Sequence, residues 1–382
     1  MEFYHDILEN LLDKLIDYRG KTPKKTLSGV PLVTAKIVKN GTINGYTEYI
    51  AEEDYDKWMV RGFPKVGDVI LTTEAPLGEV ALLKEEKVAL AQRIVCLRGK
   101  DNVLDNTYLK YYLQSGKGQK SLSARESGTT VTGIKQAELR RVDIEYPAYD
   151  DQRRIASILS SLDRKIELNN KINADLEEMA QAIFKNWLSE CSDDVTIGEL
   201  SLNITNYEKT DAEEVVLINS SDVTEGYFDH HNYSPNKNLK GHFKKRFQKG
   251  DILYSQVRPR NRHWAYCNFD ANDYLASTQL MVIRNNPSLI TSILLYQYII
   301  SDNVWKEFTL KTETRSGTFP QGNYEDLSQI RVPYNSDVEG ISNQLETLYA
   351  KMFMLEKENS RLSTLRDTLL PRLMSGELEV PE

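Results

Sequence analysis

Basic side chains with the potential to bind phosphate gather in a short stretch of the second half of the 382-residue chain. Arg258, Arg260 and Arg262 lie within five residues of one another beside a proline, and aromatic residues such as Trp264 interleave the stretch. Basic groups neutralise phosphates, and an arginine can also donate paired hydrogen bonds to a guanine edge. Lysine-rich stretches are usually solvated surface, but this density of arginine exceeds what solubility needs and favours contact with nucleic acid. The basic residues that precede the arginines are Lys237, Lys240, Lys244, Lys245, Arg246 and Lys249.

The first half of the chain carries a sparser basic set. Arg19, Lys24 and Lys25 surround a Gly-Lys-Thr-Pro turn, and Lys120 and Arg125 lie farther along. The formal net charge of −8 argues against a protein that coats nucleic acid uniformly. It is compatible with local basic surfaces, and it leaves acidic surface for protein partners.

Motifs for catalysis are missing from the sequence. There is no Walker-type phosphate loop, since Gly116-Lys117-Gly118 lies in what we expect to be a polar loop, and no G-x-S-x-G or H-E-x-x-H motif occurs. Asp68 followed by Glu85-Glu86-Lys87 resembles a nuclease acidic pattern only loosely, and a charged surface turn explains it better. The three cysteines are far apart and form no metal motif, so we expect no metal site and a reducing, cytoplasmic location. The longest apolar run is too short to cross a membrane.

A long helix is predicted from Asp151 to Leu188, a stretch without proline or glycine. Its apolar residues recur alternately four and three apart, which is the period of a seam that packs against another helix. Asn169 and Asn173 interrupt the seam with polar side chains, and a buried asparagine there can fix the register at some cost in stability. The apolar seam residues are Ile155, Leu159, Leu162, Ile166, Leu176, Ala180, Ile183 and Trp187.

The same pattern returns near the C-terminus, where Ile341 takes the place of Ile155. When the sequence is shifted so that these two isoleucines coincide, one seam position breaks the match, because Arg366 takes the place of Ala180. Similarities outside the helices keep nearly the same shift, as in the return of Tyr146-Pro147 at Val332-Pro333. The repeat therefore favours a tandem duplication over two unrelated amphipathic helices. The second seam comprises Ile341, Leu345, Leu348, Met352, Leu355, Asn359, Leu362, Leu369 and Leu373.

The rest of each half predicts a globular module of short strands and a few helices, which makes the fold class α+β. We expect a short helix over residues 1–19 and a closing strand from Leu139 to Tyr146. The Ser-Gly-Thr loops at 127–130 and 316–318 are expected to correspond to each other. The further expected elements are strands at 31–34, 66–71, 80–83, 94–97, 252–253 and 330–333 and helices at 108–113 and 293–298.

Two helical stretches and several turns resemble the specificity subunits of type I restriction–modification systems. DQRRIASILSSLDRKIELNNKINADLEEMAQAIF resembles their central region, and LSTLRDTLLPRLMSGELEV resembles their distal region. DYRGKTPKK, KVGDVILTT, INSSDVTEGYF and KGDILYSQVRP resemble the starts and strands of their target-recognition domains. The resemblance covers essentially the whole chain in the order found in the family.

This resemblance implies a two-domain architecture with two long antiparallel coiled-coil helices and pseudo-two-fold symmetry. It gives target-recognition domains at 1–150 and 191–336, long helices at 151–190 and 337–376, and a tail at 377–382. Each domain would read one half of a bipartite, asymmetric target in double-stranded DNA. The helices would set the spacer and dock two methyltransferase subunits, and two restriction–translocase subunits would join the complex. The partners would use S-adenosylmethionine, ATP and Mg, whereas this chain would bind no cofactor and contribute no catalytic residue.

An unusually wide apolar stripe on the first helix supports docking of further helices. Ile158, Ile172, Met179, Phe184 and Leu188 flank the seam, although the modules themselves could cover Phe184 and Leu188. Two other interpretations remain open: a nuclease or methyltransferase with a degenerate motif, and a coiled-coil scaffold with no role on DNA. The residues expected in helix packing and methyltransferase docking are Ile155, Leu159, Leu162, Ile166, Ile172, Leu176, Ile183, Leu345, Leu348, Met352, Leu362 and Leu369.

Overall fold

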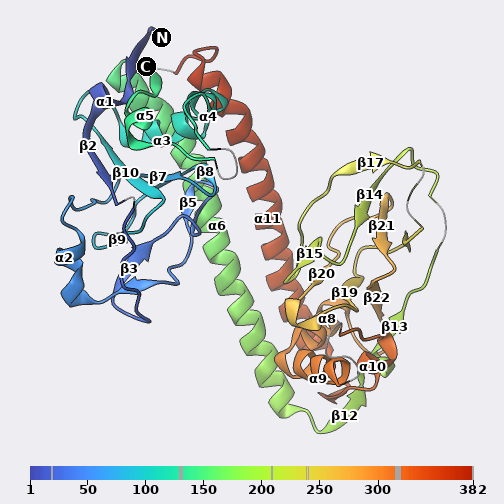
Figure 1. Ribbon diagram of the computed structural model, residues 1–382. Coiled ribbons are helices and arrows are strands. Elements are labelled where there is room, and N and C mark those ends of the chain that lie inside the picture. The colour runs from blue at the N-terminus through green and yellow to red at the C-terminus, as the bar shows by residue number, and fades with distance from the viewer. Residues whose placement is uncertain are drawn as a thin grey trace. The chain divides into compact units, whose positions relative to one another are not determined.

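A computed structural model describes residues 1–18, 20–128, 132–207, 210–237, 239, 241–314 and 320–380 (Figure 1). Arg19, Lys240, part of the Ser-Gly-Thr loop at 127–130 and all of the one at 316–318 lie outside the described residues. The chain divides into two compact units, the first formed by 1–168 with 358–382 and the second by 169–357. Each unit therefore combines a globular module with part of both long helices.

The first unit is built around a four-stranded sheet in the order β2-β10-β7-β8, whose neighbours run antiparallel. Helix α3 packs on β7, β8 and β10, and its N-cap Asp105 accepts a hydrogen bond from the Tyr108 amide. Strand β1 pairs with β11, and β3 pairs in parallel with β9. The strands of this unit are β1 (Phe3–Ile7), β2 (Leu12–Asp17), β3 (Val30–Val33), β4 (Val38–Lys39), β5 (Thr42–Ile43), β6 (Tyr49–Ile50), β7 (Val69–Thr73), β8 (Leu77–Leu82), β9 (Ala89–Leu90), β10 (Ile94–Gly99) and β11 (Asp143–Pro147). Its module helices are α1 (Leu8–Leu11), α2 (Tyr55–Trp58), α3 (Asn106–Gln114), α4 (Gly116–Ser123) and α5 (Gln136–Arg140).

The second unit repeats this plan with a sheet in the order β13-β22-β19-β20. A second sheet, β17-β14-β21-β18, contains a parallel pair between β14 and β21, as β3 and β9 do in the first unit. The strands are β12 (Asp193–Thr196), β13 (Ser201–Asn203), β14 (Glu214–Ile218), β15 (Val223–Thr224), β16 (Tyr227–Phe228), β17 (Tyr233–Pro235), β18 (Phe243–Lys245), β19 (Ile252–Ser255), β20 (Trp264–Tyr266), β21 (Tyr274–Ser277), β22 (Leu280–Asn285) and β23 (Arg331–Tyr334). The module helices are α7 (Ile197–Leu200), α8 (Ser292–Ile300), α9 (Asp302–Glu313) and α10 (Tyr324–Ser328).

The two modules share most of their elements in the same order, which confirms the predicted duplication of the fold, although the first has helix α2 where the second has strand β18. Each begins with a strand, one turn of helix and a second strand, as in β1-α1-β2 and β12-α7-β13. The first of these strands pairs in both modules with the last one, β11 or β23. The predicted α+β class is therefore correct, and the module helices α3 and α8 lie at equivalent positions.

Both long helices are present, as α6 (Tyr149–Glu190), which begins two residues before its predicted start, and α11 (Glu339–Met374), which is two residues shorter at each end than predicted. They run antiparallel within each unit. In the first unit, Asp163 bonds to Arg366 and Lys165 pairs with Glu358. In the second unit, the Asn173 side chain donates to the Met352 carbonyl oxygen at 3.4 Å. The seam period and the asparagine position thus identified this packing correctly.

Three local predictions are wrong. Residues 1–19 are not one helix, because pairing with β11 and β10 draws both flanks of α1 into strands despite their helical spacing. Gly116–Gly118 begins helix α4 instead of a loop, with the Ser115 hydroxyl capping the Gly118 amide. Leu139 belongs to α5, so the closing strand begins only at Asp143.

The core of the first module also takes in the start of α6 and the end of α11. Ile155 and Leu159 are fully buried with Leu8 and Tyr108, and Leu373 joins the same cluster. In the second unit, Ala180 and Phe184 are buried with the residues of α8 and with Tyr349 of α11. Each module therefore holds the beginning of the helix that follows it and the end of the other long helix.

Candidate nucleic-acid interface

The arginine cluster of the second module forms a tight loop after strand β19. A single 3-10 turn, Pro259–Asn261, is flanked by Arg258 and Arg262, whose φ angles of 50° and 53° lie in the left-handed region. Residues with a side chain adopt this region at some cost, and such strain collects at functional sites when the surroundings enforce it. Here the Arg258 amide donates to the Pro320 carbonyl oxygen at 3.0 Å, and Val257 forms a β-bridge with Gln321.

Helix α9 holds the loop from the other side. The Trp305 indole donates to the Pro259 carbonyl oxygen at 2.9 Å. The Arg262 guanidinium stacks on the Trp305 ring at 4.3 Å and pairs with Asp302 at 3.4 Å. Arg262 thus positions the loop, whereas Arg258 and Arg260 are exposed. Arg260 is 72% exposed although it pairs with Glu313, so this ion pair is accessible to a competing phosphate.

The first module carries an equivalent loop with different chemistry. Ala75 has a φ angle of 51° and precedes Pro76, as Arg258 precedes Pro259. The residue two positions before each of these is held in a similar way: the Thr73 amide donates to the Arg93 carbonyl oxygen, and the Gln256 amide donates to that of Gln279. The same backbone position is thus neutral and small in one module and cationic in the other.

Strand alternation divides the lysines that precede the arginine loop. Lys244 is exposed, whereas Lys245 points into the module, where its Nζ donates to the Leu280 carbonyl oxygen at 2.7 Å. Burial lowers the pKa of Lys245. The structure therefore gives Lys245 an internal role and removes it from the candidate interface. Arg246 is half-buried, and its Nη1 has no hydrogen-bond partner within the described residues.

The basic residues of the first module are placed in two separate groups. Lys24 is exposed, and Lys25 pairs with Glu48 at 2.7 Å. Lys120 is exposed on α4, but Arg125 lies between Glu138 and Asp143, at 3.5 and 3.3 Å. These carboxylates compensate the charge of Arg125, which makes it a weaker phosphate ligand than Lys24 or Lys120.

Asp68, the first acidic residue of the pattern that resembled a nuclease, has a structural role. Asp68 is almost fully buried and accepts two hydrogen bonds from the Arg98 guanidinium, at 2.7 and 2.6 Å. Asp251 forms the same fork with Arg284 in the second module. Within the described ranges, no group of three or more histidine, cysteine or acidic side chains is arranged to hold a metal ion. None of the described helices is long and apolar enough to span a membrane.

The wide apolar stripe of α6 is mostly covered by the modules. Phe184 is buried against Tyr298, with ring centroids 5.0 Å apart, and Ile158 and Leu188 pack on the module cores. Of the two alternatives left open for Phe184, coverage by the module is the correct one, because α8 occupies that face. The other predicted seam residues are buried or half-buried: Leu162, Ile166, Ile172, Leu176, Ile183, Leu345, Leu348, Met352, Leu362 and Leu369.

Four large apolar side chains remain exposed on the long helices, and they form two equivalent pairs. The first unit exposes Leu168 of α6 and Leu365 of α11, whereas the second exposes Met354 of α11 and Met179 of α6. The shift that carries Ile155 to Ile341 also carries Leu168 to Met354 and Met179 to Leu365. The duplication therefore presents the same exposed apolar pair twice.

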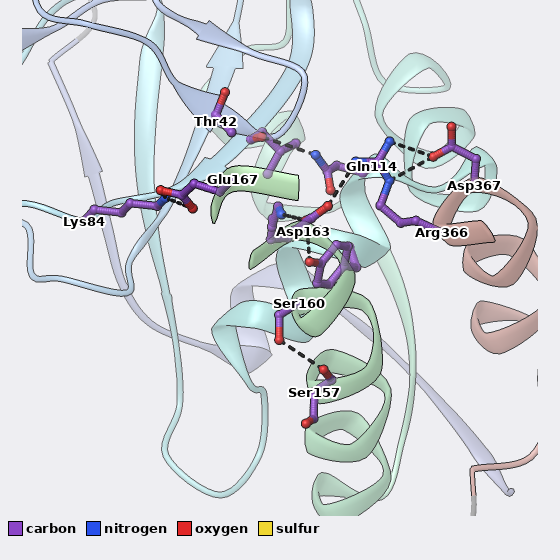
Figure 2. Close-up of polar contacts among 12 residues, drawn as sticks. Thr42, Lys84, Gln114, Ser157, Ser160, Asp163, Glu167, Arg366 and Asp367 are labelled. Carbon is purple, nitrogen blue, oxygen red and sulfur yellow. Dashed lines mark hydrogen bonds and ion pairs between the residues drawn. The ribbon is translucent and has the colours of Figure 1, made fainter. Parts of the chain in front are cut away.

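A network of charged side chains joins the helices of the first unit to its module (Figure 2). Asp163 of α6 accepts from Lys110 and Tyr111 of α3 at 2.8 and 2.5 Å, and from Arg366 of α11 at 3.0 Å. Burial alone would raise the pKa of Asp163, but Lys110 and the donated hydrogen bonds hold that pKa below its usual range. The sequence analysis did not predict this network. The sequence feature that pointed to it was Arg366, at the one seam position where the repeat is broken.

An acidic pocket of about 510 Å³ lies in the second unit, beside the arginine loop. Glu177 of α6 lines it together with Glu225 and Asp229, and Arg262 lies at its edge. Carboxylates repel phosphate, so this surface is unsuited to nucleic acid.

Two homologous modules, each with a loop after the same strand, and two shared long helices define a tandem-repeat recognition protein. Residues 14–178 match the family model of the type I restriction modification DNA specificity domain. The MjaIX specificity subunit of Methanocaldococcus jannaschii is 25% identical over 401 aligned positions, which cover 95% of this chain and 91% of that protein. By these matches the chain is similar to the specificity subunits of type I restriction–modification systems.

A second relative is similar to part of this sequence, and a solved structure is similar to the whole fold. The HindI specificity subunit of Haemophilus influenzae is 32% identical over 177 residues, which cover 46% of this chain and 39% of that protein. The crystal structure of a type I specificity subunit from M. genitalium superposes with a TM-score of 0.63 at 18% identity. That superposition covers all of this chain and 97% of the other, so the two proteins share their fold.

Proposed function

We propose that this chain selects the DNA target of a type I methyltransferase and restriction complex. Each module reads one half of a bipartite target, and the two halves differ because equivalent loops carry different chemistry. The observation that supports this proposal is the pair of loops that follow equivalent strands, in each of which a residue with a left-handed φ angle precedes a proline, Ala75 in one loop and Arg258 in the other. Arg258 and Arg260 are suited to guanine edges or phosphates, whereas Ala75 can offer only an apolar contact.

The long helices carry the partner subunits in this proposal. The exposed apolar pairs Leu168–Leu365 and Met354–Met179 repeat at equivalent positions, which fits two copies of one methyltransferase subunit. Those subunits bring S-adenosylmethionine and transfer its methyl group to adenine N6, and two restriction–translocase subunits use ATP and Mg. The chain itself binds no cofactor and supplies no catalytic side chain, and its contribution is the choice of sequence.

Methylome sequencing of cells that express the chain with its methyltransferase tests the division between modules. We expect Arg258→Ala with Arg260→Ala to relax or abolish methylation at bases of one half-site and to leave the other half-site unchanged. A paired arginine contact discriminates bases by about 1–3 kcal/mol, so the affected positions should lose roughly tenfold or more in selectivity. Lys306→Ala, an exposed cation on α9, is the matched control and should leave both half-sites intact.

An assay with purified protein tests whether this chain catalyses methyl transfer by itself. The chain alone should leave DNA unmodified in the presence of labelled S-adenosylmethionine, and modification should appear when the methyltransferase subunit is added. Methyl transfer by the chain alone would refute the non-catalytic role, and equal changes in both half-sites of the double variant would refute the assignment of modules.

A further inference from the structure

The two units join their helices to their modules at the same positions but with opposite chemistry. The Asp163 junction of the first unit comprises Asp163, Lys110, Tyr111 and Arg366, which are linked by ion pairs and hydrogen bonds. The side chains of Lys110, Asp163 and Arg366 are 7, 26 and 28% exposed, so this cluster is largely removed from water. Charged hydrogen bonds in such surroundings are strong, and an unmatched partner is costly.

The Tyr349 junction of the second unit occupies the equivalent positions, each reached by the shift that carries Ile155 to Ile341. Tyr349 stands in place of Asp163, Tyr296 in place of Lys110, and Gln297 in place of Tyr111. Gln297 donates its side-chain amide to the Tyr349 hydroxyl, as Tyr111 donates to Asp163. The fourth position is Ala180, which is fully buried in the same cluster as Tyr349 and Tyr296. The second junction is therefore neutral throughout.

The fourth residue of each junction comes from the other half of the duplication. Module 1 and the start of α6 provide three members of the Asp163 junction, and the end of α11 provides Arg366. Module 2 and the start of α11 provide three members of the Tyr349 junction, and the end of α6 provides Ala180. A duplicated chain could instead pair each half with the same half of a second copy, because the helix seams are equivalent.

We infer that these two junctions make the chain pair with its own other half and reject the same half of a second copy. A pair of N-terminal halves would place Ala180 opposite Asp163, whose Oδ1 would then lose its Arg366 donor. A pair of C-terminal halves would place Arg366 among Tyr349, Tyr296 and Gln297, where no carboxylate of the junction can receive it. Both kinds of like pair therefore contain a mismatched charge, and such unfavourable contacts are one way in which polar residues in an interface specify partners.

Exchange of the two fourth residues in the full-length chain tests this pairing rule. The double variant Ala180→Arg with Arg366→Ala mismatches both junctions of a single chain. Two such chains can restore all four of their junctions if the N-terminal half of one pairs with the N-terminal half of the other, and the C-terminal halves pair likewise. A partner within the same chain has an effective concentration of order millimolar, about a thousandfold above a micromolar sample. Four restored junctions, each worth roughly tenfold or more, exceed that advantage.

Light scattering and native mass spectrometry at micromolar concentration measure the outcome. We expect the wild type to be a monomer and the exchanged variant to be predominantly a two-chain assembly. Leu168→Met with Met354→Leu exchanges equivalent residues at exposed positions and is the control, which should remain monomeric. A folded exchanged variant that stays monomeric would overturn the inference.

A cleavable wild-type chain provides a test that needs no change in the core. A protease site inserted after the exposed Ser192, between α6 and β12, allows the intact folded chain to be cut into its halves. Tagged and untagged cleaved chains are then mixed, and native mass spectrometry identifies the pairs after exchange. Pairs of one N-terminal and one C-terminal half are expected at more than about tenfold excess over like pairs. A statistical mixture of pairs would refute the pairing rule even if the exchanged variant failed to fold.

Discussion

Glu356 of α11 lies where its charged form is disfavoured. Burial raises the pKa of this carboxyl to about 7, and the nearby Glu177 adds to the shift, while a hydrogen bond from Asn268 opposes it. The folded state therefore holds a proton on Glu356 at pH values where the unfolded chain has released it. The side chain thus makes the stability of the second unit depend on pH near neutrality.

We expect Glu356→Gln to remove this dependence. A raised pKa means that the free energy of unfolding falls as pH rises from about 4.5 to about 7 and is level above that window. The variant should match the wild type near pH 5 and exceed its stability by about 2 kcal/mol at pH 8, since one pKa unit corresponds to about 1.4 kcal/mol. Urea unfolding across this range measures the effect, with Glu346→Gln, an exposed carboxylate on the same helix, as the control. Parallel stability profiles for wild type and variant would contradict the assignment.

Single residues were the least predictable feature of the candidate interface. The sequence could mark Lys244 and Lys245 as basic, but only the register of β18 decides that Lys245 points inward. Arg262 belongs to the predicted cluster, yet its role depends on Trp305, which lies far along the chain in α9. The Asp163 junction is likewise assembled from three segments, and no local pattern contains such a contact.

At the scale of elements, the periodic and strongly apolar segments were predicted best. The alternating four-and-three seam identified α6 and α11, and continuous apolar runs identified strands such as β10. The start of the chain failed because its apolar spacing fits a helix, while pairing with two distant strands decides its structure. The width of the α6 stripe could not decide whether a module or a further helix covers Phe184, since a stripe does not show which neighbour packs on it.

The exposed apolar pairs on the long helices lead to a prediction about assembly. Replacing Met179 and Met354 by glutamate should prevent one methyltransferase subunit from binding, because a charge would have to be buried at the contact. Native mass spectrometry should then detect one bound methyltransferase where the wild type binds two. Lys351→Glu places the same charge at an exposed polar position of α11 and should retain both subunits. Retention of two subunits by the methionine variant would assign docking to a different surface.

At the scale of the whole molecule, the duplication is the feature that the sequence revealed most directly. One constant shift matched the seams, the closing strands and the exposed pairs, and the structure repeats most elements in the same order. The same shift identified Arg366 as the one mismatched seam position. Its role became clear only in the structure, because the sequence repeat does not show which residues surround it. Two similar halves with different loops and different junctions suit a subunit that reads an asymmetric target.

The helices should also set the distance between the two half-sites. An insertion must lengthen both helices together, because Asp163 pairs with Arg366 in one unit and Asn173 with Met352 in the other. We therefore consider four helix-forming residues inserted after Leu168 in α6 and four after Lys357 in α11. Four residues add about 6 Å and turn the helix by about 400°, so the faces return to within about 40° of their register.

Since DNA rises about 3.4 Å per base pair, we expect the spacer in the methylated target to lengthen by one or two base pairs. Both half-sites should keep their bases, because the loops that follow β7 and β19 are untouched. Methylome sequencing of the double insertion measures the spacer directly. Insertion in α6 alone is the control, and it should reduce activity because it shifts one helix against the other. Altered half-site bases, or an unchanged spacer in an active complex, would show that another part of the assembly sets the distance.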